Sequence, residues 1–151
     1  MPTNFDLVLG VESSCDEMAA AVLRIGRAAS APLRAPGSPR GGFEIVASVV
    51  QGQAEVHGPY GGVVPELASR DHVRTVSDVV ARAFAEAGVA PEQLDGVAVT
   101  VGPGLVGSLL VGMSFGKALA YRLGVPLVGV HHLTGHLASV ELAEPLERRT
   151  G

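Results

Sequence analysis

Carboxyl and thiol groups are concentrated in one short polar stretch, ESSCDE at residues 12–17, near the start of the 151-residue chain. Carboxylates presented where a strand ends are a common basis for metal, phosphate or proton-transfer chemistry. Asp16 and Glu17 are adjacent, so their side chains diverge if the backbone stays extended. A solvated hairpin turn accounts for the same residues equally well. Cys15 has no evident base to activate it as a nucleophile, and we expect it to be a small buried side chain.

Two histidines, His132 and His136, are spaced i and i+4 in the string HHLTGH of residues 131–136. On a helix their imidazole rings would face the same way, which is the arrangement of half a metal site, whereas His131 would point elsewhere. Most protein metal centres have three or four ligands, so spacing alone leaves surface or core histidines as an equal interpretation. A zinc-protease motif is disfavoured because Leu133 stands where H-E-x-x-H has its glutamate.

A glycine-rich string, GPGLVG at residues 102–107, follows a predicted strand and precedes a predicted helix. The pattern GxGxxG in this context is typical of dinucleotide sites. The next predicted strand ends in GVH at residues 129–131, however, without an acid to hold a ribose, and Pro103 removes one backbone donor. The N–H groups at such a helix start still suit an anion.

A fourth string, HGPYGGVVPELASRDH at residues 57–72, combines a glycine turn with a proline suited to the first position of a helix. Physically it indicates a glycine turn that leads into a polar helix start. By itself it supports no more than an ordered loop entering a helix.

The composition disfavours several classes of protein. Apolar residues make up 47% of the chain and charged residues 17%, which is enough to build a sizeable core. Tryptophan is absent, with four Phe and two Tyr, so stacking on single-stranded nucleic acid is disfavoured. The net charge of −4 lacks the basic footprint of an autonomous nucleic-acid binder, although a basic partner could still bring RNA to the chain.

The chain also lacks the signals of export or membrane insertion. A single cysteine cannot form an internal disulfide, and the N-terminal region carries Asp6 and Glu12 without a basic segment. No apolar run approaches 18 residues. We therefore expect a soluble, cytoplasmic protein that does not bind a membrane.

The positions of these strings depend on an alternating series of strands and helices. The element order is βββαβαβα, which predicts a mixed sheet with helices on its faces. Residues 26–42 are rich in Gly, Pro and Ser and predict a flexible inserted loop, whose arginines could touch RNA phosphates but are better explained by solvation. The predicted strands cover Phe5–Val11 (buried on both faces), Ala19–Ile25, Phe43–Val50, Leu94–Val101 and Pro126–Val130, and the predicted helices cover Pro65–Ala87, Leu105–Leu123 and His132–Leu142.

Taken together, GVESSCDE, YGGVVPELASRDH, GPGLVGSLLVG and HHLTGH, in this order and spacing, closely resemble the TsaD family, the tRNA threonylcarbamoyladenosine transferases once named glycoproteases. The resemblance covers essentially the whole chain except residues 26–42, and about the first half of a typical member. It implies an α/β fold, one lobe of the actin-like and sugar-kinase-like ATPase (ribonuclease H-like) architecture. Residues 1–151 would be the first lobe of a two-lobed enzyme, with the second lobe absent.

The resemblance also implies an activity and a set of partners. The family moves a threonylcarbamoyl group from threonylcarbamoyl-AMP onto N6 of the adenosine beside the anticodon of tRNA. The expected partners are tRNA, a TsaB-like paralogue and a TsaE-like ATPase. The expected cofactor is one divalent metal ion, iron or zinc.

The site residues carried over by the resemblance fall in three of the four strings. His132 and His136 would hold the metal ion, with a third protein ligand from the second lobe. Asp16 and Glu17 would lie at the active site, with Asp16 the stronger candidate for catalysis. The residues expected to contact the substrate are Ser14, Gly104 and Gly107.

Two departures from the family pattern affect these expectations. Met18 stands where the family usually has Thr, so a hydroxyl contact beside Asp16 would be lost. Without the second lobe, with its nucleotide-binding turn and third metal ligand, we expect the chain alone to be an incomplete enzyme. The alternative is a non-catalytic partner or scaffold module like TsaB, which keeps the fold and lacks the metal site. The two histidines and the Asp16–Glu17 pair argue against that alternative.

Overall fold

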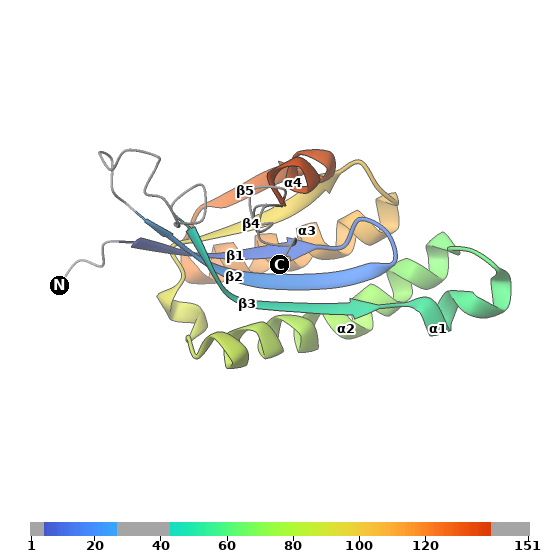
Figure 1. Cartoon of the computed structure of the whole chain (residues 1–151), viewed down its shortest axis with the longest axis horizontal. Helices are drawn as coiled ribbons and strands as arrows, with labels where there is room; N and C mark the ends of the chain where they lie inside the picture. Colours follow the sequence, from blue (N-terminus) through green and yellow to red (C-terminus); the bar gives the residue numbers. More distant parts are fainter. Residues whose placement is uncertain (1–4, 27–42, 140–151) are drawn as a thin grey trace, which may run out of the picture.

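The computed structural model describes residues 5–26 and 43–139, which are built around a five-stranded mixed sheet (Figure 1). Its strands stand in the order β3-β2-β1-β4-β5. β2 is antiparallel to β1 and β3, whereas β1, β4 and β5 are parallel. The strands are β1 (Phe5–Glu12), β2 (Glu17–Gly26), β3 (Phe43–Gly52), β4 (Gly96–Gly102) and β5 (Leu127–His131).

One edge of this sheet collects the polar strings. β1, β4 and β5 run in the same direction, so their carboxyl ends lie at the same edge. β3 ends there as well, because it is antiparallel to a strand that is antiparallel to β1. Residues 12–17, 102–107 and 131–136 therefore meet, although Glu12 and His132 are 120 residues apart in the chain.

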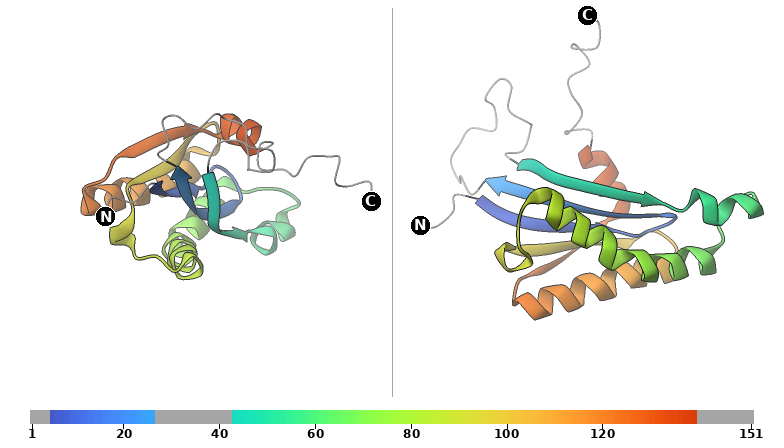
Figure 2. Two further views of the ribbon diagram at one scale, coloured as in Figure 1. Left: turned by 60° about the vertical axis from the view of Figure 1, so that its left-hand side comes forward. Right: turned by 90° about the horizontal axis from the view of Figure 1, so that it is seen from below.

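Helices lie on both sides of the sheet (Figure 2). The long helices α2 (Pro65–Ala87) and α3 (Val106–Leu123) pack on one face, and α4 (His132–Ser139) lies on the other side beside β4 and β5. Shorter pieces connect these elements, namely α1 (Ala54–His57) and two 3₁₀ turns at Gly58–Tyr60 and Pro91–Gln93.

The ends of α2 follow from local chemistry. Pro65 occupies the first helical turn, where its missing N–H costs nothing. Gly88 ends the helix with φ +64, a left-handed conformation that glycine adopts without strain. Its N–H donates to the Ala85 carbonyl and the N–H of Val89 donates to the Phe84 carbonyl, which satisfies two carbonyls of the last turn. The predicted bounds of this helix are confirmed.

Helix α3 presents a stripe of small residues to the sheet, and this stripe brings the helix axis close to the strands. Ser108, Gly112, Gly116 and Ala120 recur every four residues and are buried. A Cβ atom on Gly116 would overlap the side chain of Val99 on β4. The absence of side chains here is therefore what allows the close packing of α3 on β4.

The core lies between the sheet and the two long helices. Leu7, Leu9 and Val11 of β1 are buried on this side, whereas Val8 and Gly10 point to the other face and stay half-exposed. The prediction that β1 is buried on both faces is therefore wrong for the described chain. The strand alternates, because α2 and α3 cover the face that carries the leucines.

The predicted α/β class, a mixed sheet with helices on its faces, is confirmed. The order βββαβαβα is also confirmed, with the single turn α1 inserted after β3. Apart from Gly26, the loop predicted over 26–42 lies outside the described residues, as do residues 140–142 of the last predicted helix. No helix in the described ranges is long and apolar enough to cross a membrane.

Candidate active site

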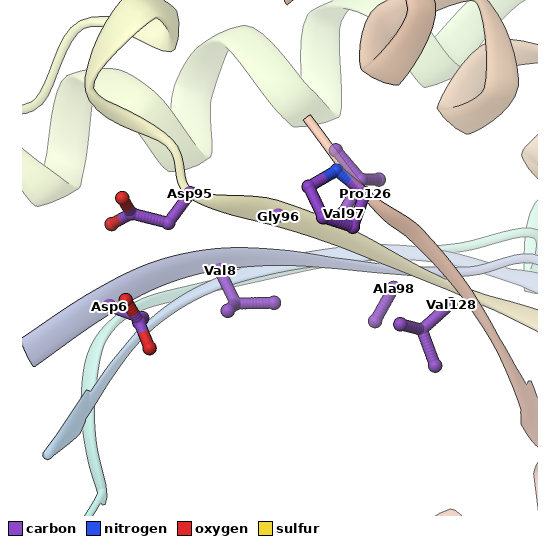
Figure 3. Close-up of a pocket in the computed structure, with 8 residues that line it drawn as sticks. All are labelled: Asp6, Val8, Asp95, Gly96, Val97, Ala98, Pro126 and Val128. Atoms are coloured by element: carbon purple, nitrogen blue, oxygen red, sulfur yellow. The ribbon is translucent and has the colours of Figure 1, made fainter. Parts of the chain in front are cut away.

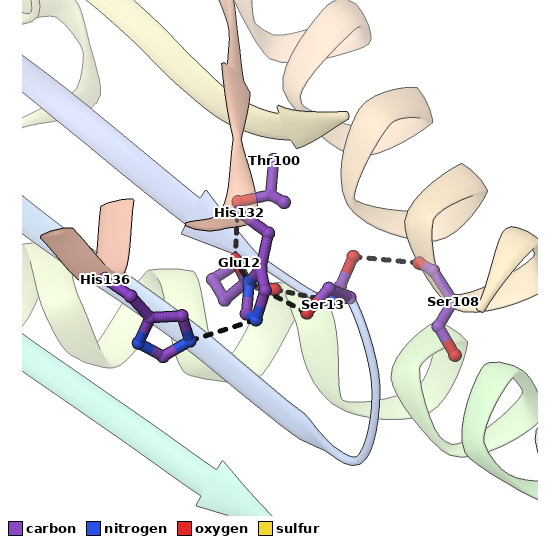
Figure 4. Close-up of polar contacts among 7 residues, drawn as sticks. Glu12, Ser13, Thr100, Ser108, His132 and His136 are labelled. Atoms are coloured by element: carbon purple, nitrogen blue, oxygen red, sulfur yellow. Dashed lines mark hydrogen bonds and ion pairs between the residues drawn. The ribbon is translucent and has the colours of Figure 1, made fainter. Parts of the chain in front are cut away.

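Glu12 is the centre of a polar cluster at the carboxyl ends of β1, β4 and β5 (Figure 4). Its Oε1 accepts the backbone N–H of Ser14 at 2.5 Å, and its Oε2 accepts the hydroxyl of Thr100 at 2.5 Å. The same Oε2 lies 3.2 Å from Nδ1 of His132. One carboxylate thus links the turn after β1 to the ends of the two neighbouring parallel strands.

The charge of Glu12 follows from these contacts. Burial raises its pKa, but the hydrogen bonds from Ser14, Thr100 and His132 lower it by more. The net result is a pKa below the ordinary value for glutamate, so the side chain is a carboxylate at neutral pH.

His132 and His136 face each other, as their i and i+4 spacing predicts. Their Nε2 atoms are 3.0 Å apart and the rings meet edge to face, with centroids 4.4 Å apart. The other nitrogen of His132 lies 3.2 Å from both Glu12 Oε2 and Ser14 Oγ. A carboxylate behind Nδ1 places the proton there and leaves Nε2 as the free electron-pair donor.

The separation of the two Nε2 atoms suits a shared metal ion. Two nitrogens each about 2.1 Å from one ion, at an angle of about 90–110°, lie roughly 3.0–3.4 Å apart. Within the described ranges no third His, Cys, Asp or Glu joins them in a group that could hold a metal. The spacing of His132 and His136 thus fits two ligands of one ion.

The turn between β1 and β2 is held by backbone hydrogen bonds from two other segments, one before α3 and one before α1. The Ser14 carbonyl accepts the N–H of Leu105 at 2.7 Å, just before α3. Gly104 lies so close to Ser14 that a Cβ atom there would overlap the Ser14 backbone. The Asp16 carbonyl accepts the N–H of Gln53 at 3.0 Å.

The three reactive side chains of this turn differ in exposure. Asp16 is half-buried and Glu17 is exposed, and among the described residues neither forms a hydrogen bond or ion pair with the two histidines. The expected burial of Cys15 is wrong, since the turn carries its side chain outward into solvent. Partial desolvation raises the pKa of its thiol, as do the hydrogen bond and charge of Asp16, so the group is a poor nucleophile at neutral pH.

Ser14, Gly104 and Gly107, the residues expected to contact substrate, lie at or beside this edge. Ser14 is buried and its hydroxyl contacts His132. A Cβ on Gly107 would come within 3.1 Å of Ser69 on α2, so this glycine also allows the two long helices to pack closely. Met18, in place of the usual Thr, is fully buried in the core, where a thioether packs without needing a polar partner.

A shallow hollow of about 350 Å³ opens at the other end of the strands (Figure 3). It lies where β1, β4 and β5 begin, and its lining is mainly apolar. Ligand sites of open α/β sheets lie at the carboxyl ends, so this hollow is separate from the cluster around Glu12. The lining residues are Asp6, Val8, Asp95, Gly96, Val97, Ala98, Pro126 and Val128.

The roles of Glu12 and Thr100 were not predicted from the sequence. Glu12 was only one of three acids in a turn, and Thr100 only a residue of a buried strand. The signal available was positional, because both stand at the end of a strand that the parallel pairing brings beside His132.

The fold is of the actin-like and sugar-kinase-like class, and its polar groups are gathered at the carboxyl ends of parallel strands. The family model described as "TsaD: tRNA N6-adenosine threonylcarbamoyltransferase" matches residues 44–148. The chain therefore belongs to the TsaD family.

Two curated relatives named tRNA N6-adenosine threonylcarbamoyltransferase illustrate the similarity. The protein of Magnetococcus marinus is 54% identical over 132 residues, which cover 87% of this chain and 35% of the relative. That of Syntrophus aciditrophicus is 49% identical over 138 residues, which cover 91% of this chain and 36% of the relative. The chain thus spans about a third of the length of these relatives, so the expectation that it corresponds to about half of a typical member is wrong.

A solved structure, YeaZ from Pseudomonas aeruginosa, has the same fold, with a TM-score of 0.53. The superposition covers 83% of this chain and 43% of that chain at 18% sequence identity. At this identity the likeness concerns the fold alone.

Proposed function

We propose that this chain is the metal-binding first lobe of an enzyme that transfers a threonylcarbamoyl group from threonylcarbamoyl-AMP to N6 of the adenosine next to the anticodon of tRNA. The observation that carries this proposal is the histidine pair, with Nε2 atoms 3.0 Å apart and Glu12 placed behind His132. A carboxylate that orients a metal-binding histidine is a recurrent feature of metal centres. This feature, together with membership of the TsaD family, favours the catalytic interpretation over a non-catalytic TsaB-like module.

His132 and His136 would hold one iron or zinc ion, with a third protein ligand from the part of the relatives' length that this chain does not span. When bound, such an ion polarises the leaving phosphate or the carbonyl of the acyl-adenylate. Glu12 holds the proton of His132 on Nδ1, so that the lone pair of Nε2 would be available to such an ion.

The transfer itself requires positioning more than activation, because an acyl-adenylate is already activated. The N6 amine attacks the carbonyl carbon, a C–N bond forms, and the bond from that carbon to the phosphate oxygen of AMP breaks. Asp16 is the residue we place closest to this amine, where its carboxylate orients the N–H and accepts the proton as the bond forms. Glu17 is next in the chain and more exposed, and its negative charge would favour the uptake of this proton.

The proposed protein partner is a TsaB-like paralogue, and a TsaE-like ATPase would join the same complex. Four large apolar side chains on α2 and α3 are more than half exposed, which supports a protein partner on the face formed by these two helices. They are Val73, Val106, Leu110 and Tyr121. A net charge of −4 suits an arrangement in which a partner supplies basic surface for tRNA.

The test is a transfer assay with an enzyme that joins this chain to the remaining length its relatives carry. The mixture contains tRNA, threonylcarbamoyl-AMP, metal and both partner proteins, and the product measured is modified adenosine. We expect Asp16→Ala to lower kcat by about 10²–10⁴-fold, the usual contribution of a general base. The matched control is Asp78→Ala, which removes an exposed carboxylate on α2 far from the strand ends.

Two outcomes would overturn the proposal. One is full activity of the Asp16→Ala enzyme, which would remove the assigned base. The other is transfer by the 151-residue chain alone, since we expect a single lobe to offer only one wall of the nucleotide cleft.

A further inference from the structure

Three buried polar side chains form a continuous chain of hydrogen bonds between the start of α2 and the turn that carries Asp16. Gln53, His57 and His72 are 2%, 5% and 0% exposed, and we call them the His–Gln–His relay. Nothing in the proposed reaction so far uses it.

The direction of each hydrogen bond in the relay follows from its ends. The backbone N–H of Val64 donates to Nδ1 of His57 at 3.3 Å, so the proton of this ring is on Nε2. That Nε2 donates to Oε1 of Gln53 at 3.1 Å. The amide of Gln53 is thereby oriented with its oxygen toward His57 and its NH₂ group on the opposite side.

The second half of the relay continues with the same polarity. Nε2 of Gln53 donates to the Ala68 carbonyl at 3.2 Å and to Nδ1 of His72 at 3.2 Å. His72 therefore also carries its proton on Nε2, and it donates to the Cys15 carbonyl at 2.9 Å. The rings of His57 and His72 each carry a single proton in this arrangement, because a second proton would place one N–H donor opposite another.

The relay ends on the peptide groups that flank Asp16. His72 binds the Cys15 carbonyl through its side chain, and Gln53 binds the Asp16 carbonyl through its backbone N–H at 3.0 Å. With the bond from Leu105 to Ser14, three successive carbonyls of the turn are held by groups from three elements. Such a fully satisfied buried network favours one backbone conformation over its alternatives.

We propose that the His–Gln–His relay positions Asp16, by holding the Cys15–Asp16 backbone in the single conformation that places its carboxylate for the proposed transfer. The relay residues are positioning residues, since they contact the turn and not the substrate. The fixed conformation of the turn does not depend on the proposed function; only its effect on catalysis rests on that function. A displacement of about 1 Å of a reacting group costs on the order of 10²-fold in rate, so a fixed turn has a measurable effect.

The variant that tests the relay is Gln53→Glu, which keeps the shape and replaces the donating NH₂ by an accepting oxygen. Nδ1 of His72 must then carry a proton to donate to the new carboxylate. A neutral ring would lose the hydrogen bond to the Cys15 carbonyl, whereas a doubly protonated ring would keep it, so His72→Leu is the variant that removes this bond outright. The matched control is Gln51→Glu, the same chemical change on a half-buried side chain two residues earlier on β3.

The first measurements use the 151-residue chain. Imidazole ¹⁵N NMR should show His57 and His72 as single Nε2–H tautomers, and Gln53→Glu should place a proton on Nδ1 of His72, whereas Gln51→Glu should leave both rings unchanged. Hydrogen exchange should become at least about tenfold faster in His72→Leu at the amides of residues 53 and 105, whose acceptors are carbonyls of the turn, and should stay slow in His72→Gln. An Nδ1–H tautomer in the unmodified chain, or equal exchange in His72→Leu and the unmodified chain, would overturn the relay.

The second measurement is the transfer assay on the longer enzyme. His72→Leu should lower kcat by about 10–100-fold and leave KM for tRNA within about twofold, because the turn and not the tRNA surface is altered. His72→Gln, which keeps a donor near the Cys15 carbonyl, should retain most activity. Equal kcat in all variants would overturn the positioning role. Inactivity of the unmodified enzyme would instead count against the proposed function, while the NMR and exchange results would still decide whether the relay holds the turn.

Discussion

Replacing Glu12 by Gln would change the protonation of the histidine pair while keeping the shape of the site. In the unmodified chain, Oε1 of Glu12 accepts a hydrogen bond from the N–H of Ser14, and Oε2 accepts from the Thr100 hydroxyl and from His132. An amide has one oxygen and cannot do both. If its oxygen faces Ser14, its NH₂ group faces Nδ1 of His132. The histidine proton must then move to Nε2, the atom that would otherwise bind the metal ion.

The expected loss of metal affinity follows from the role of carboxylates that hydrogen-bond to a metal-binding histidine. Their loss weakens metal affinity by about 10–100-fold, which corresponds to about 1.4–2.7 kcal/mol. We expect a value near the lower end, because the Glu12 side chain is 34% exposed and water can replace part of its hydrogen bonding.

The assay is a zinc titration of the 151-residue chain followed by calorimetry. Binding by the unmodified chain should be weak, since two ligands leave the coordination shell open to water. Glu17→Gln is the control, because it makes the same chemical change on an exposed carboxylate of the same turn. Equal affinity of Glu12→Gln and the unmodified chain would refute the orienting role of Glu12. Equal binding by the His132→Ala, His136→Ala double variant would refute the metal site itself.

Three further predictions concern stability and reactivity. Gly112→Ala should lower the free energy of unfolding by about 1–3 kcal/mol in urea, because the added Cβ would overlap the Ser13 hydroxyl that binds α3; an unchanged midpoint would contradict this. The pKa of Glu12 is lowered on folding, so its contribution to stability should be present above its ordinary value of 4.5 and be lost as the pH falls through the lower folded value. Urea titrations from pH 6 to pH 3 should therefore show the difference between the unmodified chain and Glu12→Gln shrinking toward acid pH. The raised pKa of Cys15 should slow its alkylation by iodoacetamide at pH 8 relative to a free cysteine, and Asp16→Asn should speed it up.

The hydrophobic periodicity and the positions of proline and glycine were sufficient to predict the long elements of this fold. Pro65 and Gly88 bound α2, because one residue lacks the N–H that a helix start does not need and the other adopts a left-handed conformation. The turn α1 was missed because four residues are too few to show a helical period. The i and i+4 spacing of His132 and His136 predicted that they would face each other, since that contact depends only on local geometry.

Contacts between distant segments were not predictable in the same way. The bond between Glu12 and His132 joins strands whose adjacency depends on the sheet order, and which side chains point to the same face depends on register. His57 and His72 lie in a string that suggested only a helix entry, and polar side chains there would ordinarily be assigned to the surface. They are buried because each finds its partner in Gln53, which the sequence pattern did not single out.

The two histidines of the candidate metal site are held very differently, and this difference bears on how the site would work. His132 is fixed by the carboxylate of Glu12 and the hydroxyl of Ser14, both anchored to the end of β1. The ring of His136 has its hydrogen bond and ring contact with His132, and the described helix that carries it has no buried residue. The position of His132 would thus be set by the sheet before an ion binds, whereas the position of His136 depends on an exposed helix that can adjust. If His132 and His136 bind one ion, an adjustable second histidine would allow the coordination shell to close when further ligands arrive, without disturbing the turn that carries Asp16.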